Sequence, residues 1–385
     1  MLLFGYLFCV LLGLSYLWLI RGYLYHWQLL PADIPDDVPF APPFLSIIVA
    51  ARNEEKTISS CMNSLIKLEY PIDKYEIIFV DDHSIDKTAE IIKEYQSQFQ
   101  QLHLISLQNE GENESIKFPK RRALEAGIAF SKGEIILMTD ADCEVSPHWA
   151  KLISSVFKIE NCVFVGGPVL ISLEKKTMLT FFQALDMTGM MLITGAGFHS
   201  GNQLLANGAN MAFSKKAFQD SGGFSNFPAR ASGDDMFLLH QLNECYPGRI
   251  RFLKSLKGLV KTKPMSTLGE FIQQRIRWAS KNSHYKELKI SISIVLIFLL
   301  STLTILLGVL SFIKFNLFFP LFLILYLSKF SGDYMLQREA ILFFKESRLS
   351  RYIFISQNIH TLYIFFIGFA GSLLPKYPWK GRIVK

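Results

Sequence analysis

Long apolar stretches at the two ends of this chain constrain its fold more than any other feature. Residues 1–20, 290–313 and 352–375 contain no Asp, Glu, Lys or Arg. A helix needs about 20 mostly apolar residues to cross the hydrocarbon core of a bilayer, so each stretch is long enough to span it. Hydrophobic residues make up 50% of the chain, and because the excess lies in these stretches we expect an integral membrane protein.

The first apolar stretch has the features of a retained anchor. It is followed by Arg21, with no basic residue before it and no small-residue cleavage site after it. These features favour a membrane anchor over residues 1–28 rather than a cleaved signal peptide. Because Lys and Arg collect on the cytoplasmic side of membrane proteins, Arg21 predicts that the following residues lie in the cytoplasm, at the inner or plasma membrane.

The C-terminal region, residues 286–385, is expected to form two to three membrane helices. Its middle segment, Phe315–Ser328, is uncharged but has only 14 residues and contains Pro320. A re-entrant segment and a spanning helix are therefore both open, and we favour the spanning helix. In either case one basic segment, the loop 329–351 or the C-terminal tail, lies outside, so the positive-inside rule does not fix the topology.

Residues 42–285 have normal charge density and room for one large core. Apolar strand patterns alternate with helical patterns there, as where FLSIIVAARNEE precedes the helical spacing of residues 56–68. This alternation predicts an α/β domain with a doubly wound, mostly parallel sheet, flanked by N- and C-terminal transmembrane helices. The five cysteines are isolated and lack CxxC spacing, which argues against a disulfide framework or a zinc site. The net charge is +7, and most basic clusters flank the apolar stretches, so membrane lipids rather than nucleic acid are the expected partner.

Three predicted strands end in charged residues. The first ends in Arg52–Glu54, the second in Asp81 and Asp82, and a later one in Asp140 and Asp142. Ligands of such sheets bind beyond the carboxyl ends of the strands, so these side chains are expected to gather around one ligand. Alternation places Asp140 and Asp142 on the same side of an extended chain, where their charges repel unless a cation lies between them. Hard oxygen ligands beside a diphosphate indicate Mg²⁺ or Mn²⁺.

The ordered motifs carry a family resemblance. They are SIIVAARNEE, VDDHSIDKT, PKRRALEAGI, LMTDADCEVSPHW, ANGANMAFSKKAF, SGGF, SGDDMFLL and QQRIRW. In this order and spacing the chain resembles the membrane-bound family 2 glycosyltransferases, which include ceramide glucosyltransferase, hyaluronan synthase and cellulose synthase. The resemblance covers about residues 46–281 and implies a GT-A nucleotide-sugar domain.

The resemblance implies roles for individual residues. Those expected to bind the nucleotide-sugar are Ala50, Arg52, Glu54, Asp82 and Lys120, the last beside the diphosphate. Asp140 and Asp142 match the metal motif, with Asp142 the more direct ligand and Asp140 also near the sugar or ribose. Asp235 matches the general base, which takes the proton of the acceptor hydroxyl, and Asp234 would support it or contact the sugar. SGDD can also cap a helix, because Ser and Asp are good N-caps, and both interpretations can hold together.

The QxxRW pattern consists of Gln274, Arg277 and Trp278. Offsets of three and four residues put these side chains on one helix face, where an arginine can bind phosphate beside an aromatic platform for a sugar. A basic amphipathic helix at the membrane surface would look similar, with Arg275 among its basic residues. The resemblance places the motif near the acceptor and the leaving diphosphate, and Asn207 and Asn210 on the acceptor side.

Together these features predict a metal-dependent, inverting glycosyltransferase of the hexosyltransferase type (EC 2.4). It would move a sugar from a nucleotide-sugar donor, a UDP-sugar by preference, to a lipid-linked or glycolipid acceptor in cell envelope glycan biosynthesis. A processive polysaccharide synthase is the alternative, because QxxRW is often associated with chain extension, although few helices are available to line a glycan channel. A sugar-nucleotide pyrophosphorylase would share the sheet but would need neither membrane helices nor the Asp235 and Trp278 motifs.

Overall fold

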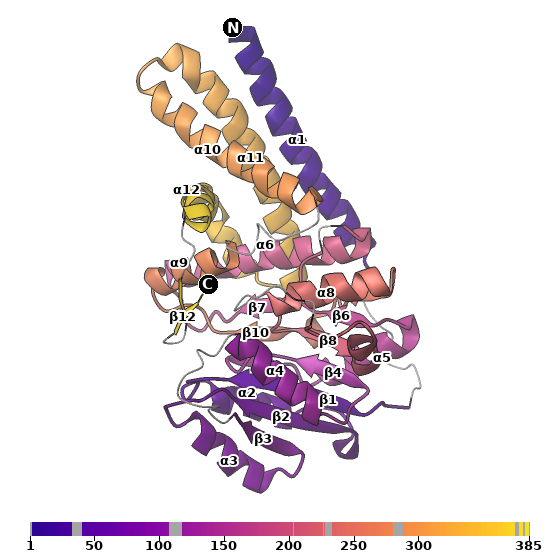
Figure 1. Cartoon of the computed structure of the whole chain (residues 1–385). Coiled ribbons are helices and arrows are strands. Elements are labelled where there is room, and N and C mark those ends of the chain that lie inside the picture. The colour runs from indigo at the N-terminus through magenta and orange to yellow at the C-terminus, as the bar shows by residue number, and fades with distance from the viewer. Residues whose placement is uncertain are drawn as a thin grey trace. The chain divides into compact units, whose positions relative to one another are not determined.

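The computed structural model describes residues 2–32, 41–107, 118–202, 204–225, 227, 233–279, 288–373, 377–379 and 382–384. Contacts divide the chain into two units. The first, called the sheet unit, comprises Leu30–Ser172, Leu204–Lys263 and Pro378–Lys385. The second, called the helical unit, comprises Met1–Leu29, Leu173–Gln203 and Pro264–Tyr377. Figure 1 labels the helices and strands of both.

A seven-stranded sheet forms the core of the sheet unit (Figure 1), in the order β3-β2-β1-β4-β8-β6-β9. The strands are β1 Leu45–Ala51, β2 Tyr75–Asp81, β3 Leu102–Ser106, β4 Ile135–Met138, β6 Phe164–Gly166, β8 Met211–Ser214 and β9 Ile250–Phe252. β8 runs antiparallel to its neighbours β4 and β6, and the other neighbouring pairs are parallel. The mostly parallel α/β sheet predicted from the alternating pattern is therefore confirmed.

Two smaller sheets accompany the main one. The three-stranded sheet has the order β5-β10-β7, and the two-stranded one pairs β11 with β12. Their bounds are β5 Cys143–Val145, β7 Val169–Ile171, β10 Val260–Thr262, β11 Tyr377–Trp379 and β12 Arg382–Val384. β5 begins directly after Asp142, so the turn that carries the two predicted metal ligands is fixed by a strand on each side.

Six helices described in the sheet unit are α2 Ile58–Ile66, α3 Thr88–Gln98, α4 Pro119–Phe130, α5 Trp149–Glu160, α7 Lys215–Asp220 and α8 Asp234–Cys245. Short 3₁₀ turns occupy Ile72–Lys74 and Leu256–Gly258. α2 shows why these helices form, because it buries Ile58, Cys61, Met62 and Leu65 at helical spacing. α4 approaches β1 closely at Gly127, where a Cβ atom would lie only 2.7 Å from Cγ2 of Ile48.

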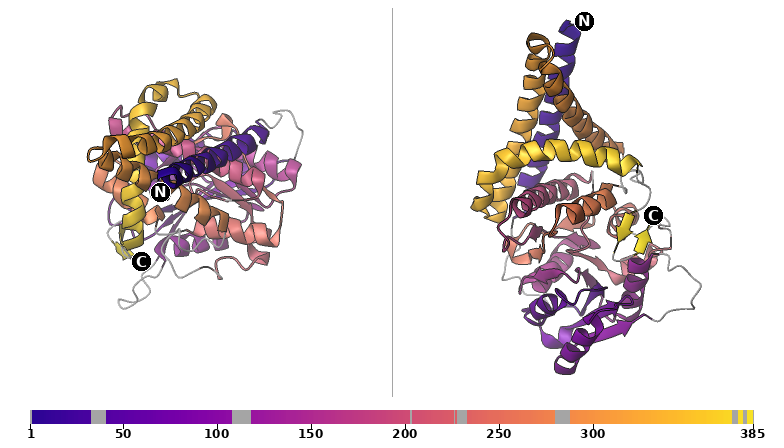
Figure 2. Two further views of the ribbon diagram at one scale, coloured as in Figure 1. Left: turned by 90° about the horizontal axis from the view of Figure 1, so that it is seen from above. Right: turned by 90° about the vertical axis from the view of Figure 1, so that its left-hand side faces the viewer.

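The helical unit contains α1 Leu2–Leu29, α6 Met178–Ser200, α9 Leu268–Ala279, α10 Leu288–Ser311, α11 Phe315–Phe344 and α12 Ile353–Leu373, with a 3₁₀ turn over Ser347–Tyr352. Four segments are long and apolar enough to cross a membrane: Leu3–Leu29, Lys289–Ser311, Phe315–Phe344 and Ser347–Ala370. α1, α10 and α11 run alongside one another, and α12 lies across them (Figures 1 and 2).

The third apolar segment forms the helix that we favoured, and it is long and apolar enough to span a membrane. It is longer than the uncharged stretch Phe315–Ser328, because α11 is one helix of 30 residues that continues to Phe344, so most of the expected loop 329–351 is helical. Pro320 lies in its second turn, where it removes one backbone hydrogen bond without ending the helix. Lys329 does not end it either, because its charge is paired with Asp333 one turn later.

The contacts also divide the chain differently from the ranges 1–28, 42–285 and 286–385. α6 and α9 lie in the helical unit, although both fall within residues 42–285. α6 contacts α1 and α11, and α9 contacts α12. The physical reason is that α6 is apolar on most of its surface, so it packs among helices rather than on the sheet.

Candidate active site

The carboxyl ends of β2 and β1 place the predicted nucleoside residues together. Ala50 of β1 pairs with Val80 of β2, and the strands end in register one residue later. Beyond them, Nη1 of Arg52 donates to the carbonyl oxygen of Asp82 at 2.6 Å and lies 4.0 Å from the Asp82 carboxylate. Asp82 is buried, and its carboxylate also contacts Nδ1 of His83 at 2.9 Å. Arg52 is thereby fixed across the ends of two strands.

Glu54 shapes the turn that leads from β1 into α2. Its carboxylate accepts a hydrogen bond from the Thr57 hydroxyl at 2.6 Å, and its backbone N–H donates to Oγ1 of Thr88 at 2.7 Å. Asp81 has a similar local role, since its carboxylate accepts from the Ser84 N–H at 3.3 Å. The turn holds Glu54 two residues from Arg52, at the same edge of the sheet.

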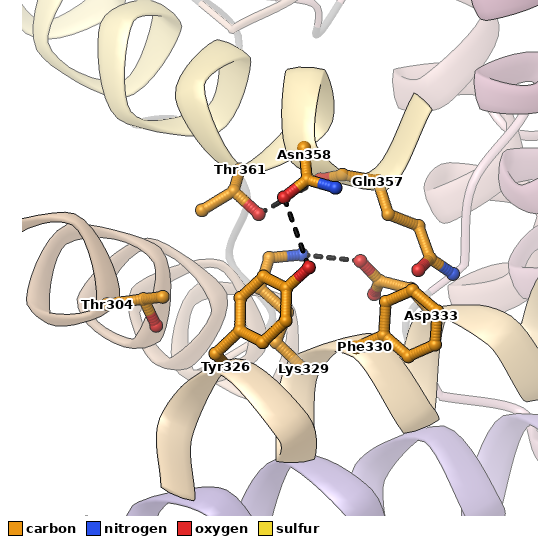
Figure 3. A pocket seen from close by; sticks show the side chains of 8 residues that line it. All are labelled: Thr304, Tyr326, Lys329, Phe330, Asp333, Gln357, Asn358 and Thr361. Atoms are coloured by element: carbon orange, nitrogen blue, oxygen red, sulfur yellow. Dashed lines mark hydrogen bonds and ion pairs between the residues drawn. The ribbon is translucent and has the colours of Figure 1, made fainter. Parts of the chain in front are cut away.

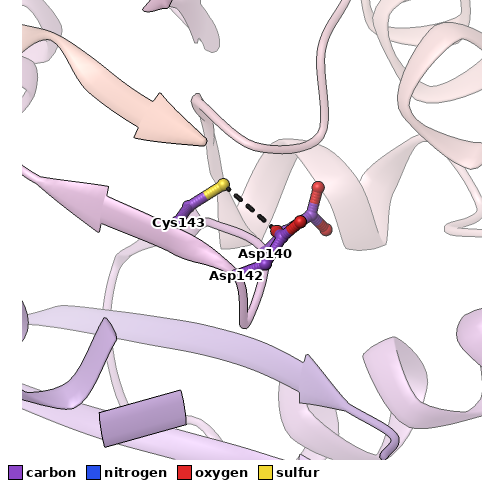
Figure 4. Close-up of side chains that lie close together, drawn as sticks. All are labelled: Asp140, Asp142 and Cys143. Atoms are coloured by element: carbon purple, nitrogen blue, oxygen red, sulfur yellow. Dashed lines mark hydrogen bonds between the residues drawn. The ribbon is translucent and has the colours of Figure 1, made fainter. Parts of the chain in front are cut away.

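Asp140 and Asp142 lie in the turn between β4 and β5 (Figure 4). One ligand atom from each, with Sγ of Cys143, forms a group in which all atoms lie within 4.8 Å of one another. Burial and the two neighbouring carboxylates raise the pKa of the Cys143 thiol well above its usual value, so the thiol stays protonated and is a poor metal ligand. The two carboxylates fit a hard divalent cation such as Mg²⁺ or Mn²⁺.

Lys120 and Asp235 belong to two different helices, and Lys120 contacts this turn directly. Nζ of Lys120, on α4, lies 2.7 Å from Oδ1 of Asp140. Oδ2 of Asp235 accepts a hydrogen bond from the Gly208 N–H at 3.2 Å. A Cβ atom built on Gly208 would lie 3.8 Å from this Asp235 oxygen and 3.9 Å from Nζ of Lys120. Gly208 therefore lies close to both the predicted base and the lysine, and the lysine in turn pairs with one predicted metal ligand.

The two acids at the start of α8 have different environments. Asp235 is half-buried and lies in the first turn of α8. Asp234 is only 6% exposed, and its Oδ1 accepts from Nε and Nη2 of Arg121 at 2.8 and 2.7 Å. Burial raises the pKa of Asp234, and Arg121 partly offsets this. Gly233 is the N-cap, with φ of 109°, so α8 starts at Asp234 without a side-chain cap.

The two asparagines predicted on the acceptor side are used differently. Asn207 has a half-buried side chain, and its Oδ1 accepts from the Ala209 N–H at 3.0 Å within a turn. Asn210 is buried, accepts from Nε1 of Trp149 at 2.8 Å, and donates to the carbonyl oxygens of Pro168 and Gly258. These bonds connect the residue before β8 to α5 and to the backbone at Pro168 and Gly258. Asn210 is therefore a core residue of the sheet unit, and the structure does not place it among the exposed acids.

The QxxRW residues Gln274, Arg277 and Trp278 lie on α9, in the helical unit. All three are half-buried. Arg275, which follows Gln274, was counted among the basic residues of a helix at the membrane surface. That interpretation is wrong, because Arg275 is only 2% exposed. Its Nη2 lies 2.7 Å from the Asp186 carboxylate, and its guanidinium stacks 4.2 Å from the Trp278 ring centroid. The signal that was missed is Asp186, a lone acid in an apolar helix, which requires a buried partner.

Comparisons with known proteins agree with this geometry. The model of "Glycosyl transferase family 2" matches residues 46–220, and that of "Glycosyl transferase family group 2" matches residues 135–370, more than half of the chain. A beta-monoglucosyldiacylglycerol synthase of Nostoc sp. is 31% identical over 160 residues, which are 41% of this chain and 33% of that protein. The probable glycosyltransferase YdaM of Bacillus subtilis is 25% identical over 280 residues, 70% of this chain and 63% of that protein.

A solved structure shares the fold. The mannosyltransferase PcManGT from Pyrobaculum calidifontis, in complex with GDP-Man and Mn2+, superposes with a TM-score of 0.52 at 16% identity, covering 92% of this chain and 99% of that one. The chain spans only about a third of the Nostoc relative and less than two thirds of the Bacillus one. The α/β sheet, the strand-end acids and the match over residues 135–370 lead to one conclusion. The chain is a member of the family 2 glycosyltransferases.

Proposed function

We propose that this chain transfers one sugar from a nucleotide-sugar, a UDP-sugar by preference, to the hydroxyl group of a membrane lipid or glycolipid, with inversion at the anomeric carbon. The observation that carries this proposal is that Asp235 and Lys120 lie on either side of Gly208 and that Lys120 pairs with Asp140. A base, a cation for the leaving diphosphate and a metal ligand are the groups that such a reaction requires. The similarity to the beta-monoglucosyldiacylglycerol synthase of Nostoc supports a lipid acceptor.

Each residue has a distinct part in this scheme. Arg52 and Asp82 hold the nucleoside, with Ala50 and Glu54 beside them at the strand ends. The Asp235 carboxylate accepts the proton of the acceptor hydroxyl while the oxygen of that hydroxyl forms a bond to the anomeric carbon. The bond from that carbon to the diphosphate oxygen breaks, and the Lys120 ammonium stabilises the charge that remains on the diphosphate. Because attack and departure occur on opposite sides of the ring, the configuration inverts.

Asp140 and Asp142 would hold the metal, Mg²⁺ or Mn²⁺. When bound, such an ion neutralises charge on a diphosphate that two carboxylates would otherwise repel. Asp234 would act indirectly, since its pairing with Arg121 fixes the start of α8 and so the position of Asp235. Gln274, Arg277 and Trp278 would bind the acceptor sugar or the leaving diphosphate from the QxxRW helix.

The apolar helices complete the proposal. Four segments could span a membrane, and we place the sheet unit of this integral membrane protein on the cytoplasmic side of the plasma membrane, where nucleotide-sugars are available. A lipid acceptor then lies in the same membrane as the enzyme. A processive synthase would need helices that enclose a water-filled glycan path, whereas the described residues offer four candidate spans to line one.

The test is nucleotide release by the purified full chain in detergent, with a panel of UDP- and GDP-sugars, with and without membrane lipid extract. We expect release that requires both lipid and Mg²⁺ or Mn²⁺, and that stops when EDTA is added. Asp142→Asn should abolish this release, while Asp73→Asn, an exposed acid of the same unit, should not change it. Sustained release without lipid, with a high-mass glycan product, would instead identify a polysaccharide synthase.

A further inference from the structure

The QxxRW helix α9 has a second row of side chains, which the proposed reaction does not use. Phe271, Arg275 and Trp278 are separated by four and three residues, so they lie on one face of the helix. The guanidinium carbon of Arg275 lies 4.9 Å from the centroid of the Phe271 ring and 4.2 Å from that of the Trp278 ring. Trp278 also follows Gln274 by four residues. It therefore belongs both to this row and to the predicted ligand-binding face.

The contacts of Arg275 show what holds its side chain in place. The residue is buried, and its Nη2 lies 2.7 Å from Oδ2 of Asp186 on α6. Its Nε and Nη1 have no hydrogen-bond partner in the described part of the chain. The guanidinium is thus held by one carboxylate and by two aromatic rings. Because a buried cation needs its counter-ion, Asp186 decides where Arg275 lies, and Arg275 in turn lies against the Trp278 ring.

Asp186 is held on its other side by α12. Nε2 of His360 lies 3.8 Å from Oδ1 of Asp186, and Nδ1 of His360 lies 3.5 Å from Nζ of Lys329 on α11. Because an ammonium group only donates, Nδ1 of the neutral ring is the acceptor, and the ring hydrogen lies on Nε2, toward Asp186. Figure 3 shows the Lys329 ammonium beside Asp333, with which it pairs at 2.6 Å. A chain of polar contacts therefore connects α11 and α12 to the QxxRW helix through Asp186.

We propose that Asp186 and Arg275 are positioning residues for the acceptor, because they fix the plane of the Trp278 ring. The inference rests on the proposed function, in which Trp278 binds the acceptor. Arg275 covers one face of this half-buried ring, so the acceptor stacks on the opposite face. A ring that is fixed before binding loses little freedom when the acceptor arrives. Releasing the ring should therefore weaken acceptor binding and leave the chemical step unchanged.

The test measures nucleotide release by the full chain in detergent against the concentration of added membrane lipid extract. Arg275→Lys keeps a charge beside Asp186 but removes the planar group that stacks on Trp278. We expect the half-saturating lipid concentration to rise about tenfold, with kcat and the donor KM within about twofold of the wild type. Arg338→Lys is the matched control at an exposed arginine of α11, and it should change none of these values.

A double variant separates positioning from stability. Asp186→Ala with Arg275→Met replaces the ion pair by apolar side chains, so it should unfold close to the wild-type midpoint. It should nevertheless keep the raised half-saturating lipid concentration, because Met has no planar cation to hold the Trp278 ring. Fluorescence gives a readout that does not depend on activity. Acrylamide should quench tryptophan emission more strongly in Arg275→Lys than in the wild type, and this gain should vanish when Trp278→Phe is added.

Three results would overturn the positioning role. The first is a double variant that recovers both its stability and the wild-type lipid dependence, because the pair would then only join helices. The others are an unchanged lipid dependence and an unchanged quenching in Arg275→Lys, which decides the question if the double variant does not fold. A wild type without lipid-dependent release would contradict the proposed function and this inference with it. An active wild type with an unaffected Arg275→Lys would contradict the positioning role alone.

Discussion

Two clusters of charged side chains, one in each unit, use the same residue types in opposite ways. In the sheet unit, the side chains of Lys120 and Asp140 are 31% and 36% exposed although their charged atoms lie 2.7 Å apart. In the helical unit, Lys329 and Asp333 pair at 2.6 Å with exposures of 3% and 10%. A charge in contact with water can exchange its partner for a ligand at little cost, whereas a buried charge is stable only with its partner. Exposure therefore distinguishes the pair that the proposed reaction uses from a pair whose charges stay bound to each other within α11.

The pair of Arg275 and Asp186 extends this comparison to the QxxRW helix. Both side chains are almost fully buried, at 2% and 8% exposure, and they join α9 to α6. Arg275 also lies between the rings of Phe271 and Trp278. One motif thus contains a buried arginine that joins α9 to α6 and, two residues later, a half-buried arginine, Arg277.

The largest effect is expected when the proposed base is removed without disturbing the fold. Asp235→Asn keeps the size of the side chain but cannot accept the acceptor proton, so kcat should fall about 10²- to 10⁴-fold. Because Asp235 is half-buried and accepts a hydrogen bond from the Gly208 N–H, the free energy of unfolding should stay within about 0.5 kcal/mol of the wild type. Donor turnover measures the loss of activity, and chemical denaturation of the same preparation measures the unchanged stability. Wild-type turnover in Asp235→Asn would remove the proposed mechanism.

The second prediction concerns stability in the helical unit, where removing a charge should destabilise the fold. Asp186→Ala leaves the Arg275 guanidinium buried without its partner, which should lower the free energy of unfolding by about 3–5 kcal/mol. Denaturation in detergent measures this loss. The double variant Asp186→Ala with Arg275→Met is the control, because an apolar pair of similar volume should recover most of the stability. If the double variant loses as much free energy of unfolding as the two single variants together, the ion pair is not what stabilises α9 against α6.

The third prediction concerns Arg121 and Asp234, a buried ion pair in the proposed active site. Arg121→Met removes two charge-assisted hydrogen bonds, so we expect a loss of about 1.5–3 kcal/mol at neutral pH. Burial already raises the pKa of Asp234, and the variant removes the cation that opposes this rise. A raised folded-state pKa stabilises the fold at low pH, and this stabilisation is lost as the pH rises through that pKa.

The stability deficit of Arg121→Met should therefore be smaller near pH 4 than at pH 8. Unfolding midpoints of the variant and the wild type across this range measure it. Arg122→Met, a change of the neighbouring arginine, is the matched control and should show no such pH dependence. A deficit that is constant with pH would mean that the variant acts through packing against Phe118 and Phe227, which the Arg121 guanidinium also contacts, rather than through the Asp234 charge.

The parts of this molecule that the sequence predicts correctly are those encoded by neighbouring residues. Asp140 and Asp142 follow an apolar strand within a few positions, so the alternation of side chains is enough to place them at one sheet edge. The alternating strands and helices fixed the fold class for the same reason. The family resemblance then connected distant segments, such as Asp235 with the metal turn, which no local pattern could do.

The errors arise where two distant residues change each other's environment. Arg275 and Lys329 have the sequence context of surface residues, and their burial depends on Asp186 and Asp333, which neutralise them in the folded chain. Asn210 belongs to a motif suited to ligand binding, but Trp149 takes its side-chain oxygen. Charge and polarity can be read from the sequence, while the partner that makes a polar group structural depends on packing.

The smallest expected effect sharpens the comparison within the helical unit. Tyr16→Phe removes the hydroxyl that donates to Asp333 but leaves Lys329 paired with that carboxylate. Since one interhelical hydrogen bond among membrane helices contributes about 0.6 kcal/mol and at most about 1.7 kcal/mol, the loss of stability should lie in this range. The control is Tyr23→Phe on the same helix, with unfolding of all variants measured in one detergent. A loss of about 3 kcal/mol or more would mean that the Tyr16 hydroxyl is needed to keep the Asp333 charge within the helices, and that ion pairing with Lys329 is not sufficient there.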